Sequence, residues 1–464
     1  MTAATLVGLM SIPALAVLYG GLVQKKWAMN TTLMVFVTFA LVLIVWVLWG
    51  FKMGFGTPLV GKWIGDPRTI LGANALEGQA TIPLVDPAMP GYAASKTGEI
   101  LNTGFKLPAS SVEYFQFVFA AITPILFIGS VLGRVNFKAW MVFVPLWITF
   151  AYCVNAFSIW GGGYWAGKGA LDFSGGYVIH LAAGVSGFVS AAIIGPRLKR
   201  DRERAIPNNL LFVAVGAGLL WLGWNGFNGG DPYFAGSDAG AAIVNTNLAT
   251  AVAMMIWILM DMFFSPDKKP TFLGGLNGMI CGLVGITPAA GYVNGLGAII
   301  IGVICSAVVW TAWYTLPKYV WPFNRVDDAL GVVYTHGIAG LLGGLLVGVL
   351  ADPNVIMYPA APGGAAFSGA GWLWGHHPHQ LLVQFEAALF IIIWDGIITA
   401  AIWMIIKYVF RMKLTFTTEE LEIGDVAIHG EEAYPQEEAL TSKLSVTASA
   451  EASPTTEEPI SVED

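Results

Sequence analysis

Two histidines stand in matching surroundings inside long apolar stretches of the chain. The pattern D-x7-H-x3-G occurs at residues 172–184 and again at 328–340, with His180 and His336 as its histidines. Imidazole can both donate and accept a hydrogen bond near neutral pH, and ionisable side chains at membrane depth usually face an interior pathway. We therefore expect His180 and His336 to form a contacting pair that lines a narrow channel.

Two other interpretations of these histidines stay open. Each imidazole could be a core side chain that bonds a helix carbonyl, or the pair could ligate haem from opposite faces of the macrocycle. The 56 glycines of the chain favour close helix packing, which leaves little space for haem.

Aromatic residues gather near the predicted outer ends of several apolar segments. They are Phe115, Phe119, Trp160, Trp224 and Phe227. The face of an aromatic ring attracts a partly desolvated cation by about 2 kcal/mol, which would suit an ion of the size of ammonium. The alternative is the belt of aromatic residues at the membrane–water boundary, and composition does not separate the two interpretations.

The elements that position these residues are predicted to be membrane-spanning helices. Only 11% of the 464 residues are charged and 56% are apolar, which excludes a soluble globular protein. Continuous rather than alternating apolar runs exclude a membrane β-barrel. Eleven segments are long enough to cross a hydrocarbon core of about 30 Å. They lie at about 2–22, 30–51, 111–132, 137–160, 175–196, 208–229, 240–264, 272–291, 294–316, 330–351 and 380–410.

Spans one to five resemble spans six to ten. Besides the histidine patterns, Ile-Thr-Pro occurs at 122–124 in the third span and at 286–288 in the eighth, with the same five-span offset. Because five is odd, the second copy enters the membrane from the opposite side, which places the site near mid-membrane. The predicted fold is an all-α polytopic membrane protein with eleven transmembrane helices, arranged as a 5+5 inverted repeat plus a final helix.

Charged residues predict the orientation and the domain limits. With alternating connectors, sixteen Lys and Arg residues fall on one side and six on the other, so the N-terminus is expected outside and the C-terminus in the cytoplasm. No charged n-region precedes the first span, which is therefore expected to be structural rather than a signal peptide. Residues 1–414 should form the transmembrane domain, with a large extracytoplasmic loop at 52–110. Residues 415–464 should form an acidic cytoplasmic tail, disordered over roughly its last 25 residues.

Composition also excludes several other kinds of site. Residues 415–464 hold 13 acidic and one basic residue, and the other 414 hold 17 acidic and 22 basic, so no basic nucleic-acid surface is present. Cys153, Cys281 and Cys305 all lie in apolar runs, where buried thiols are expected rather than disulfides or a metal site. We expect no enzyme activity, no metal and no cofactor.

Six stretches of the chain resemble the ammonium transporter family (Amt/Mep/Rh), on the Amt side, over about residues 5–435. They are SIPALAVLYGGLVQKK (11–26), GGGYWAGKGALDFSGGYVIH (161–180), GWNGFNGG (223–230), VNTNLATA (244–251), GITPAAGYV (285–293) and HQLLVQFEA (379–387). The resemblance implies a homotrimer in the cell membrane (inner or plasma), in contact with lipid and with one hydrophobic pore per subunit.

The same resemblance implies roles for individual residues. Trp160 and Phe115 match the outer ammonium-recruitment site, Phe119 and Phe227 the stacked pair that blocks the pore, and His180 and His336 the twin histidines. Asp172 and Trp224 match supporting positions.

Three residues depart from the family pattern. Asp231, followed by Pro232, stands where the family commonly has Ser in the recruitment site, and its carboxylate could attract the cation or point away. Gly331 and Val333 replace an Asp and a Phe, which puts the packing beneath His336 in doubt.

The expected function is ammonium transport. Ammonium is protonated at pH 7, as an amine with a pKa near 10 is, and moving the intact ion through an apolar pore would forfeit several kcal/mol of hydration. We therefore expect recruitment of NH4+, deprotonation near Phe119 and Phe227, and conduction of NH3 past the histidines, with or without separate transfer of the proton. Methylammonium is a further candidate substrate.

Rival functions and partners belong to other classes. An ammonium sensor would have to signal through a separate partner, and a channel for carbon dioxide or water would have no use for an aromatic cation site. The segment IGDVAIHGEEAY (423–434) resembles the family's tail, which contacts neighbouring subunits and docks PII signal proteins in many bacterial members. A solvated acidic linker is the alternative for this segment.

Overall fold

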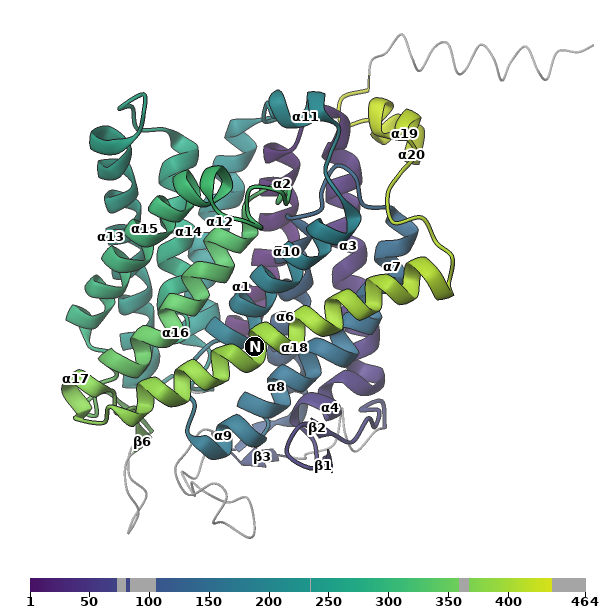
Figure 1. Ribbon diagram of the computed structural model, residues 1–464. Coiled ribbons are helices and arrows are strands. Elements are labelled where there is room, and N and C mark those ends of the chain that lie inside the picture. Colours follow the sequence, from purple (N-terminus) through teal and green to yellow (C-terminus); the bar gives the residue numbers. More distant parts are fainter. Residues whose placement is uncertain (73–80, 84–105, 234, 359–366, 436–464) are drawn as a thin grey trace, which may run out of the picture.

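The computed structural model describes residues 1–72, 81–83, 106–233, 235–358 and 367–435. Most of the predicted loop at 52–110 and the predicted disordered end of the tail lie outside these ranges. Within them the chain forms a bundle of long helices, with short helices and two-stranded hairpins at the two ends (Figure 1).

Eleven helical segments build the bundle. In the described residues, ten are long and apolar enough to cross a membrane, and a shorter apolar helix at Phe272–Ile286 takes the place of the predicted eighth span. The prediction of eleven helices is confirmed.

The first five spans are composed as follows. They are α1 (Thr2–Leu9), η1 (Met10–Leu15) and α2 (Ala16–Leu22); η2 (Lys25–Trp27), α3 (Ala28–Val45), η3 (Trp46–Gly50) and α4 (Phe51–Phe55); α6 (Ala109–Ile128); α7 (Phe137–Trp147), η5 (Ile148–Tyr152) and α8 (Cys153–Ile159), followed by the short α9 (Tyr164–Lys168); and η6 (Gly176–Leu181) with α10 (Ala182–Ile194).

The second five spans and the final span follow the short α11 (Lys199–Glu203). They are α12 (Leu210–Gly229); α13 (Ser237–Phe264); α14 (Phe272–Ile286); α15 (Gly295–Tyr319); η7 (Val333–Ile338) with α16 (Ala339–Leu350); and α18 (His379–Met404) with η8 (Ile405–Val409).

Short elements cover the two ends of the bundle. Antiparallel hairpins pair β1 (Pro58–Val60) with β2 (Ile64–Gly65), β3 (Thr81–Pro83) with β4 (Lys106–Pro108), and β5 (Ile356–Tyr358) with β6 (Phe367–Ser368). The remaining helices are α17 (Trp372–Gly375), α19 (Thr418–Ile423) and α20 (Asp425–His429). We name the end with α9 and the hairpins the Trp160 end, and the end with α11, α19 and α20 the tail end (Figure 1).

Polar side chains mark where several spans begin. Asn136, Asn209, Thr271 and Asn294 each precede a helix and accept N–H groups of its first turn. These N–H groups have no partner within the helix, so an Asn or Thr at the cap satisfies them. The apolar run that follows then continues the helix across the bundle.

Small residues allow the first span and α12 to approach closely. A Cβ atom added at Gly216, Gly223 or Gly226 would lie within 2.7 Å of an atom in the first span. Glycine is therefore required on this face, because any larger side chain would separate the helices. These two spans occupy equivalent positions in the two halves of the repeat.

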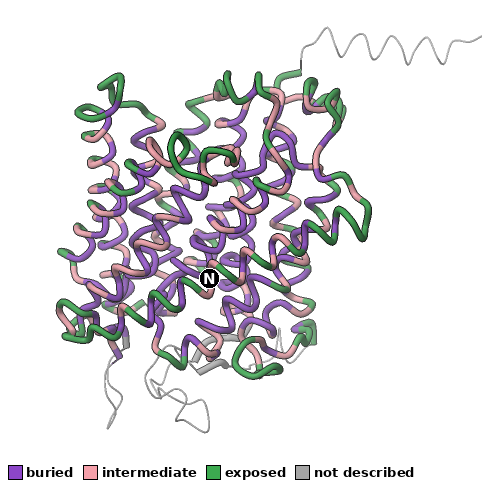
Figure 2. The backbone as a smooth tube through the Cα atoms, viewed as in Figure 1, coloured by how far each residue is buried: buried purple, intermediate pink, exposed green. Residues whose placement is uncertain are grey.

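Buried residues concentrate inside the bundle (Figure 2). Many of the exposed residues on its spans are large and apolar. Leu211, Phe263 and Ile397 are more than 60% exposed, although they lie within predicted spans. Exposed large apolar side chains in such numbers are typical of a surface that faces lipid or another subunit.

Backbone hydrogen bonds show the inverted repeat directly. Residues 173–174 donate their N–H groups to the carbonyl oxygens of 287–288, each at 3.1 Å, and residues 329–330 donate to 129–130, each at 3.2 Å. The segment before each histidine helix is thus held by the turn that ends the third or eighth span of the opposite half. The predicted relation between the two halves is confirmed.

The Ile-Thr-Pro match is a coincidence and not part of this repeat. Thr123 and Pro124 lie inside α6, whereas Thr287 and Pro288 lie in the turn after α14. The hydrogen bonds show that residues 129–130 are equivalent to 287–288. The helix of the eighth span ends at Ile286, before this turn, and is therefore shorter than the predicted span of 272–291.

Candidate functional site

His180 and His336 contact each other in the centre of the bundle. Their Nδ1 atoms are 3.2 Å apart, and their ring planes are inclined by 23°. His180 is fully buried and His336 is 5% exposed. A haem would need its iron and macrocycle between the two ligating nitrogens, and the direct contact between the Nδ1 atoms leaves no space for them there.

Each histidine helix begins in the same unusual way. Gly175 and Gly331 have φ angles of +103° and +71°, which residues other than glycine rarely adopt. The Asp172 carboxylate then accepts four consecutive N–H groups, those of residues 175–178, at 2.6 to 3.1 Å. In the second half, Asp328 Oδ2 accepts the N–H of Val333 at 2.8 Å. A carboxylate is favoured at a helix N-terminus by the helix dipole.

The packing beneath His336 accommodates the two departures from the family pattern. A Cβ atom at Gly331 would lie 2.2 Å from the ring of Trp313, so a larger residue would displace that ring. Val333 is buried and its N–H group is bonded to Asp328. Gly331 and Val333 are therefore compatible with the packing of this region.

Aromatic rings cover the histidine pair on one side. The rings of Phe119 and Phe227 stack at 4.3 Å with an angle of 21°, and both residues are fully buried. Phe227 lies 6.0 Å from the His180 ring, and Trp224 stacks on His180 at 5.3 Å. The Trp224 Nε1–H group donates to the Thr287 hydroxyl at 2.9 Å, which fixes the orientation of the indole.

The same series of rings continues to the Trp160 end. The Phe119 ring is 4.7 Å from Phe115 and 6.3 Å from Trp160, which is partly exposed. Trp160 Nε1–H donates to the backbone carbonyl of Asp172 at 2.7 Å. The structure therefore brings together all the predicted aromatic residues, both histidines and Asp172, while their functions stay predictions.

Asp231 lies just after α12 and is buried. Two residues later, the Tyr233 ring packs on Phe115 at 5.5 Å, and the Gln116 side-chain amide bonds the Tyr233 hydroxyl. The turn at 231–233 is thus part of the wall beside Phe115. Attraction of a cation by the Asp231 carboxylate stays a prediction.

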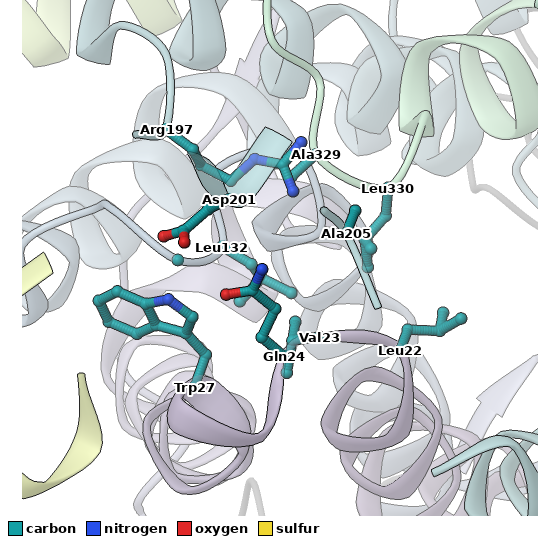
Figure 3. Close-up of a pocket in the computed structure, with 11 residues that line it drawn as sticks. Leu22, Val23, Gln24, Trp27, Leu132, Arg197, Asp201, Ala205, Ala329 and Leu330 are labelled. Carbon is teal, nitrogen blue, oxygen red and sulfur yellow. The ribbon is translucent and has the colours of Figure 1, made fainter. Parts of the chain in front are cut away.

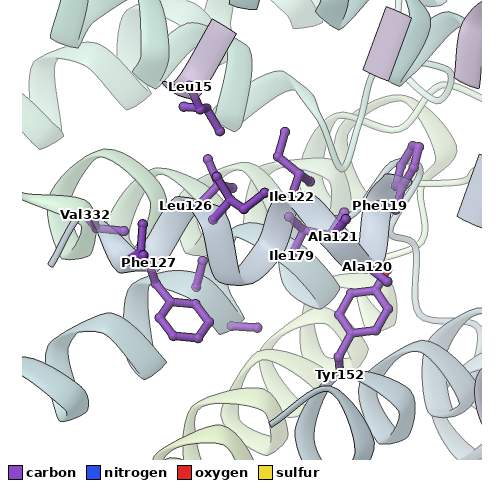
Figure 4. Packing of buried hydrophobic residues seen from close by; sticks show 14 of the residues in the cluster. Leu15, Phe119, Ala120, Ala121, Ile122, Leu126, Phe127, Tyr152, Ile179 and Val332 are labelled. Atoms are coloured by element: carbon purple, nitrogen blue, oxygen red, sulfur yellow. The ribbon is translucent and has the colours of Figure 1, made fainter. Parts of the chain in front are cut away.

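Apolar side chains of α6 pack against the starts of the two histidine helices. The helix presents Ala121, Ile122 and Phe127 to residues of other spans, among them Ile179 and Val332 (Figure 4). Ile179 directly precedes His180 in the sequence, and Val332 directly precedes the helix that contains His336. The segments that hold the imidazole pair are therefore packed by apolar side chains.

Gln384 holds the segment before Asp172 in place and was not predicted from the sequence. Its amide accepts the N–H of Leu171 and donates to the carbonyl of the same residue, both at 2.7 Å, and also donates to Gly344 at 2.8 Å. One turn earlier, Gln380 donates to the carbonyl of Gly169 at 2.8 Å. Two amides spaced i, i+4 lie on one helix face. This spacing in the sequence could have indicated that both side chains bond the same neighbouring segment.

A small cavity of about 60 Å³ lies at the tail end (Figure 3). Its lining includes Leu22, Gln24 and Arg197, together with Ala329 and Leu330 from the segment before the His336 helix. In the repeat, residues 329–330 correspond to 173–174 at the Trp160 end. The cavity therefore occupies the position that the inverted repeat relates to the aromatic site.

An ion pair borders this cavity. Arg197 binds the Asp327 carboxylate through two nitrogens, at 2.7 and 3.0 Å. Burial alone would raise the pKa of Asp327, but the hydrogen bonds and charge of Arg197 hold that pKa below its usual value.

The first part of the tail is docked on the tail end. Lys26 Nζ lies 2.9 Å from Asp201 and donates to the carbonyl of Leu421 at 2.8 Å. The Asp425 carboxylate accepts the N–H groups of residues 29–30 at the start of α3, at 2.8 and 2.9 Å. Burial raises the pKa of Asp425 to about 6. In the described residues, no group of three or more His, Cys, Asp or Glu side chains could hold a metal ion.

Known proteins are similar to this chain in both sequence and fold. Residues 1–434 match the Ammonium Transporter Family. The chain is 47% identical to a protein of Oryza sativa subsp. japonica named Ammonium transporter 3 member 2, over 94% of this chain and 88% of that protein. The crystal structure of Saccharomyces cerevisiae Mep2 aligns with a TM-score of 0.75 and 30% identity, over 90% of this chain and 86% of that chain. A Sensor Amt Protein aligns with a TM-score of 0.74 and 23% identity, over 92% and 96% of the two chains, which shows a common fold alone. The chain therefore belongs to the ammonium transporter family.

Proposed function

We propose that this protein recruits NH4+ at the Trp160 end, removes a proton near Phe119 and Phe227, and conducts NH3 past the histidine pair. The observation that carries the proposal is the unbroken series of ring contacts from Trp160 through Phe119 and Phe227 to His180 and His336. In this series, rings that attract a cation lead directly to side chains that hydrogen-bond a neutral amine.

The physical argument rests on hydration. The apolar wall and the stacked phenylalanines cannot replace the water around NH4+, and stripping it costs several kcal/mol. NH3 carries no charge, and the paired imidazoles offer it both a donor and an acceptor. The cavity beside Leu330 then provides the exit at the tail end.

The decisive test is electrophysiology on the reconstituted protein with ammonium, methylammonium and potassium. We expect a response to ammonium, a smaller one to methylammonium and none to potassium, because potassium cannot lose a proton. Measuring current and uptake together also separates net NH3 transport from transport with a separately moved proton. A potassium response equal to that of ammonium would contradict deprotonation.

Replacing His180→Leu and His336→Leu together should reduce ammonium transport to background. Leucine fills similar space but offers no hydrogen bond to NH3. The matched control changes two exposed histidines, His377→Leu and His379→Leu, and should transport as the wild type does. Full transport by the first double variant would remove the histidines from the mechanism.

We further propose that the protein works as a homotrimer in the cell membrane, with the Trp160 end outside and the tail end in the cytoplasm. The docked tail at 417–435 is proposed to couple subunits and to offer a site for a PII signal protein. Its support is the pair of backbone hydrogen bonds that Asp425 accepts at the start of α3.

The tail proposal is tested by two truncations. Deletion from Leu421 onward should lower transport severalfold without lowering membrane insertion and should abolish binding of a purified PII protein. Deletion from residue 436 onward keeps the docked helices and should leave both properties intact. Equal activity of the two truncated proteins would make the tail a simple linker.

A further inference from the structure

Asp395 is a buried acidic residue far from the histidine series along the chain. It lies in the final span, 16 residues after its start at His379 and 14 before its end at Val409, and is fully buried. At about 1.5 Å per residue, it sits more than about 20 Å along the helix from either end. An ionisable side chain at this depth is costly and calls for a functional explanation.

Asn155 of α8 forms a hydrogen bond with this carboxyl group. The Asn155 Nδ2–H group donates to Asp395 Oδ2 at 2.8 Å, and Asn155 is also fully buried. The other oxygen of each side chain, Asn155 Oδ1 and Asp395 Oδ1, has no hydrogen-bond partner among the described residues. Two buried acceptors without a donor are unusual in a folded protein.

Residues on the neighbouring elements supply no positive charge. In the described residues, no ion pair includes Asp395. One turn along α18, Thr399 donates to Ser186 of α10 at 3.1 Å, and Trp147 of α7 donates to both hydroxyls. These groups are neutral and bond one another.

We propose that Asp395 and Asn155 form a proton-binding site within the membrane, separate from the histidine pair. A proton from bulk water forms an O–H bond at Asp395 Oδ1, and that hydroxyl donates to Asn155 Oδ1. One proton therefore satisfies both unpartnered oxygens and removes the buried charge. The resulting acid–amide pair has two parallel hydrogen bonds.

This assignment explains how an acidic residue is accommodated in the buried middle of the final span. An ionised carboxylate in such surroundings takes up a proton rather than stay charged. The site joins the final span to the span of Asn155 and lies one turn from the contact of Thr399 with α10, the helix that continues from His180. Loss of the proton would place a charge at this junction.

Infrared difference spectroscopy of the full-length protein in lipid vesicles at pH 7 tests the proposal. The wild-type spectrum minus that of Asp395→Asn should contain one carboxylic-acid C=O band, which shifts in deuterium oxide because the proton exchanges. Asn155→Leu should keep this band but move it to higher frequency, since the acid loses its amide partner.

Asp261→Asn is the matched control. Asp261 is also buried in a span, but its carboxylate already accepts from Trp310 Nε1 at 2.8 Å and from the Tyr314 hydroxyl at 3.4 Å. Its replacement should remove no carboxylic-acid band. Absence of a C=O band assignable to Asp395 would overturn the proposal, and this readout does not depend on whether the protein transports ammonium.

Discussion

The starts of the two histidine helices share a backbone and differ in their side chains. Each start has a glycine with positive φ, a carboxylate that accepts N–H groups, and a pair of backbone hydrogen bonds to the opposite half. The duplicated backbone therefore sets the positions of His180 and His336. The contact between the two imidazoles follows from this shared backbone arrangement.

The surroundings of the two starts differ strongly. At the first, Asp172 accepts four N–H groups and aromatic rings stack over His180. At the second, Asp328 Oδ2 accepts the N–H of Val333 at 2.8 Å, and a cavity with the Arg197–Asp327 ion pair lies beside it. The same backbone arrangement therefore supports stacked aromatic rings at one end and, at the other, a small and mainly apolar cavity bordered by an ion pair.

The largest expected difference between the two starts lies in their capping carboxylates. Asp172→Ala leaves four buried N–H groups without an acceptor and should lower the free energy of unfolding by about 3 kcal/mol, whereas Asp328→Ala should cost about 1 kcal/mol. Thermal unfolding in detergent measures both. Asp172→Asn keeps one acceptor oxygen and should fall between them. Equal losses of unfolding free energy in Asp172→Ala and Asp328→Ala would show that the different number of accepted N–H groups does not affect stability.

Much of the fold followed from the sequence because the length of an apolar run and a repeated motif can be read directly from it. The eleven spans, the repeat of the two histidine patterns and the contact between His180 and His336 were all predicted. The Ile-Thr-Pro match failed because three residues fix neither a helix end nor its partner. Only the hydrogen bonds of residues 129–130 and 287–288 reveal the true equivalence.

The partners of two important polar residues could not be assigned from the sequence. Gln384 and Asp395 both lie in the final span, and their partners, Leu171 and Asn155, are more than 200 residues away in the chain. The rotation of an apolar helix about its axis decides which face meets which neighbour. The polar residues of this span mark a helix face, but the sequence does not say which neighbouring helix that face meets.

The ion pair at the second start should make stability depend on pH in a way that the first start does not. Because the folded pKa of Asp327 is lowered, its stabilisation is complete above the unfolded value of about 3.9 and is lost as the pH falls through the folded value. Arg197→Met removes the charge and both side-chain hydrogen bonds from a mostly buried carboxylate, which keeps only the backbone N–H of residue 197, and should cost about 2 kcal/mol at pH 7.

The same variant should also weaken the pH dependence. Without the Arg197 side chain, burial raises the folded pKa of Asp327, while the charge of Arg134 and the backbone N–H of residue 197 still lower it. The folded pKa should therefore lie closer to the unfolded value, and less stability should be lost as the pH falls. Unfolding measured at several pH values from about pH 7 down to about pH 3 tests this difference. The exposed pair Lys199 and Glu203, 3.7 Å apart, is the control, and Lys199→Met should change little. An acid dependence identical in wild type and Arg197→Met would contradict the role of the ion pair.

The smallest expected effect concerns the hydrogen bond between Trp160 and Asp172. Trp160→Phe keeps an aromatic face for the cation but removes the Nε1–H donor to the Asp172 carbonyl, with an expected loss of about 1 kcal/mol. Since this bond positions the proposed recruitment site rather than the histidines, the KM for ammonium uptake should rise severalfold while the maximal rate changes less. Trp49→Phe removes a comparable bond, to the Thr149 hydroxyl at 3.0 Å, from a partly buried tryptophan outside the ring series. It should therefore leave KM unchanged, and a rise in KM equal to that of Trp160→Phe would mean that the first bond acts only through general stability.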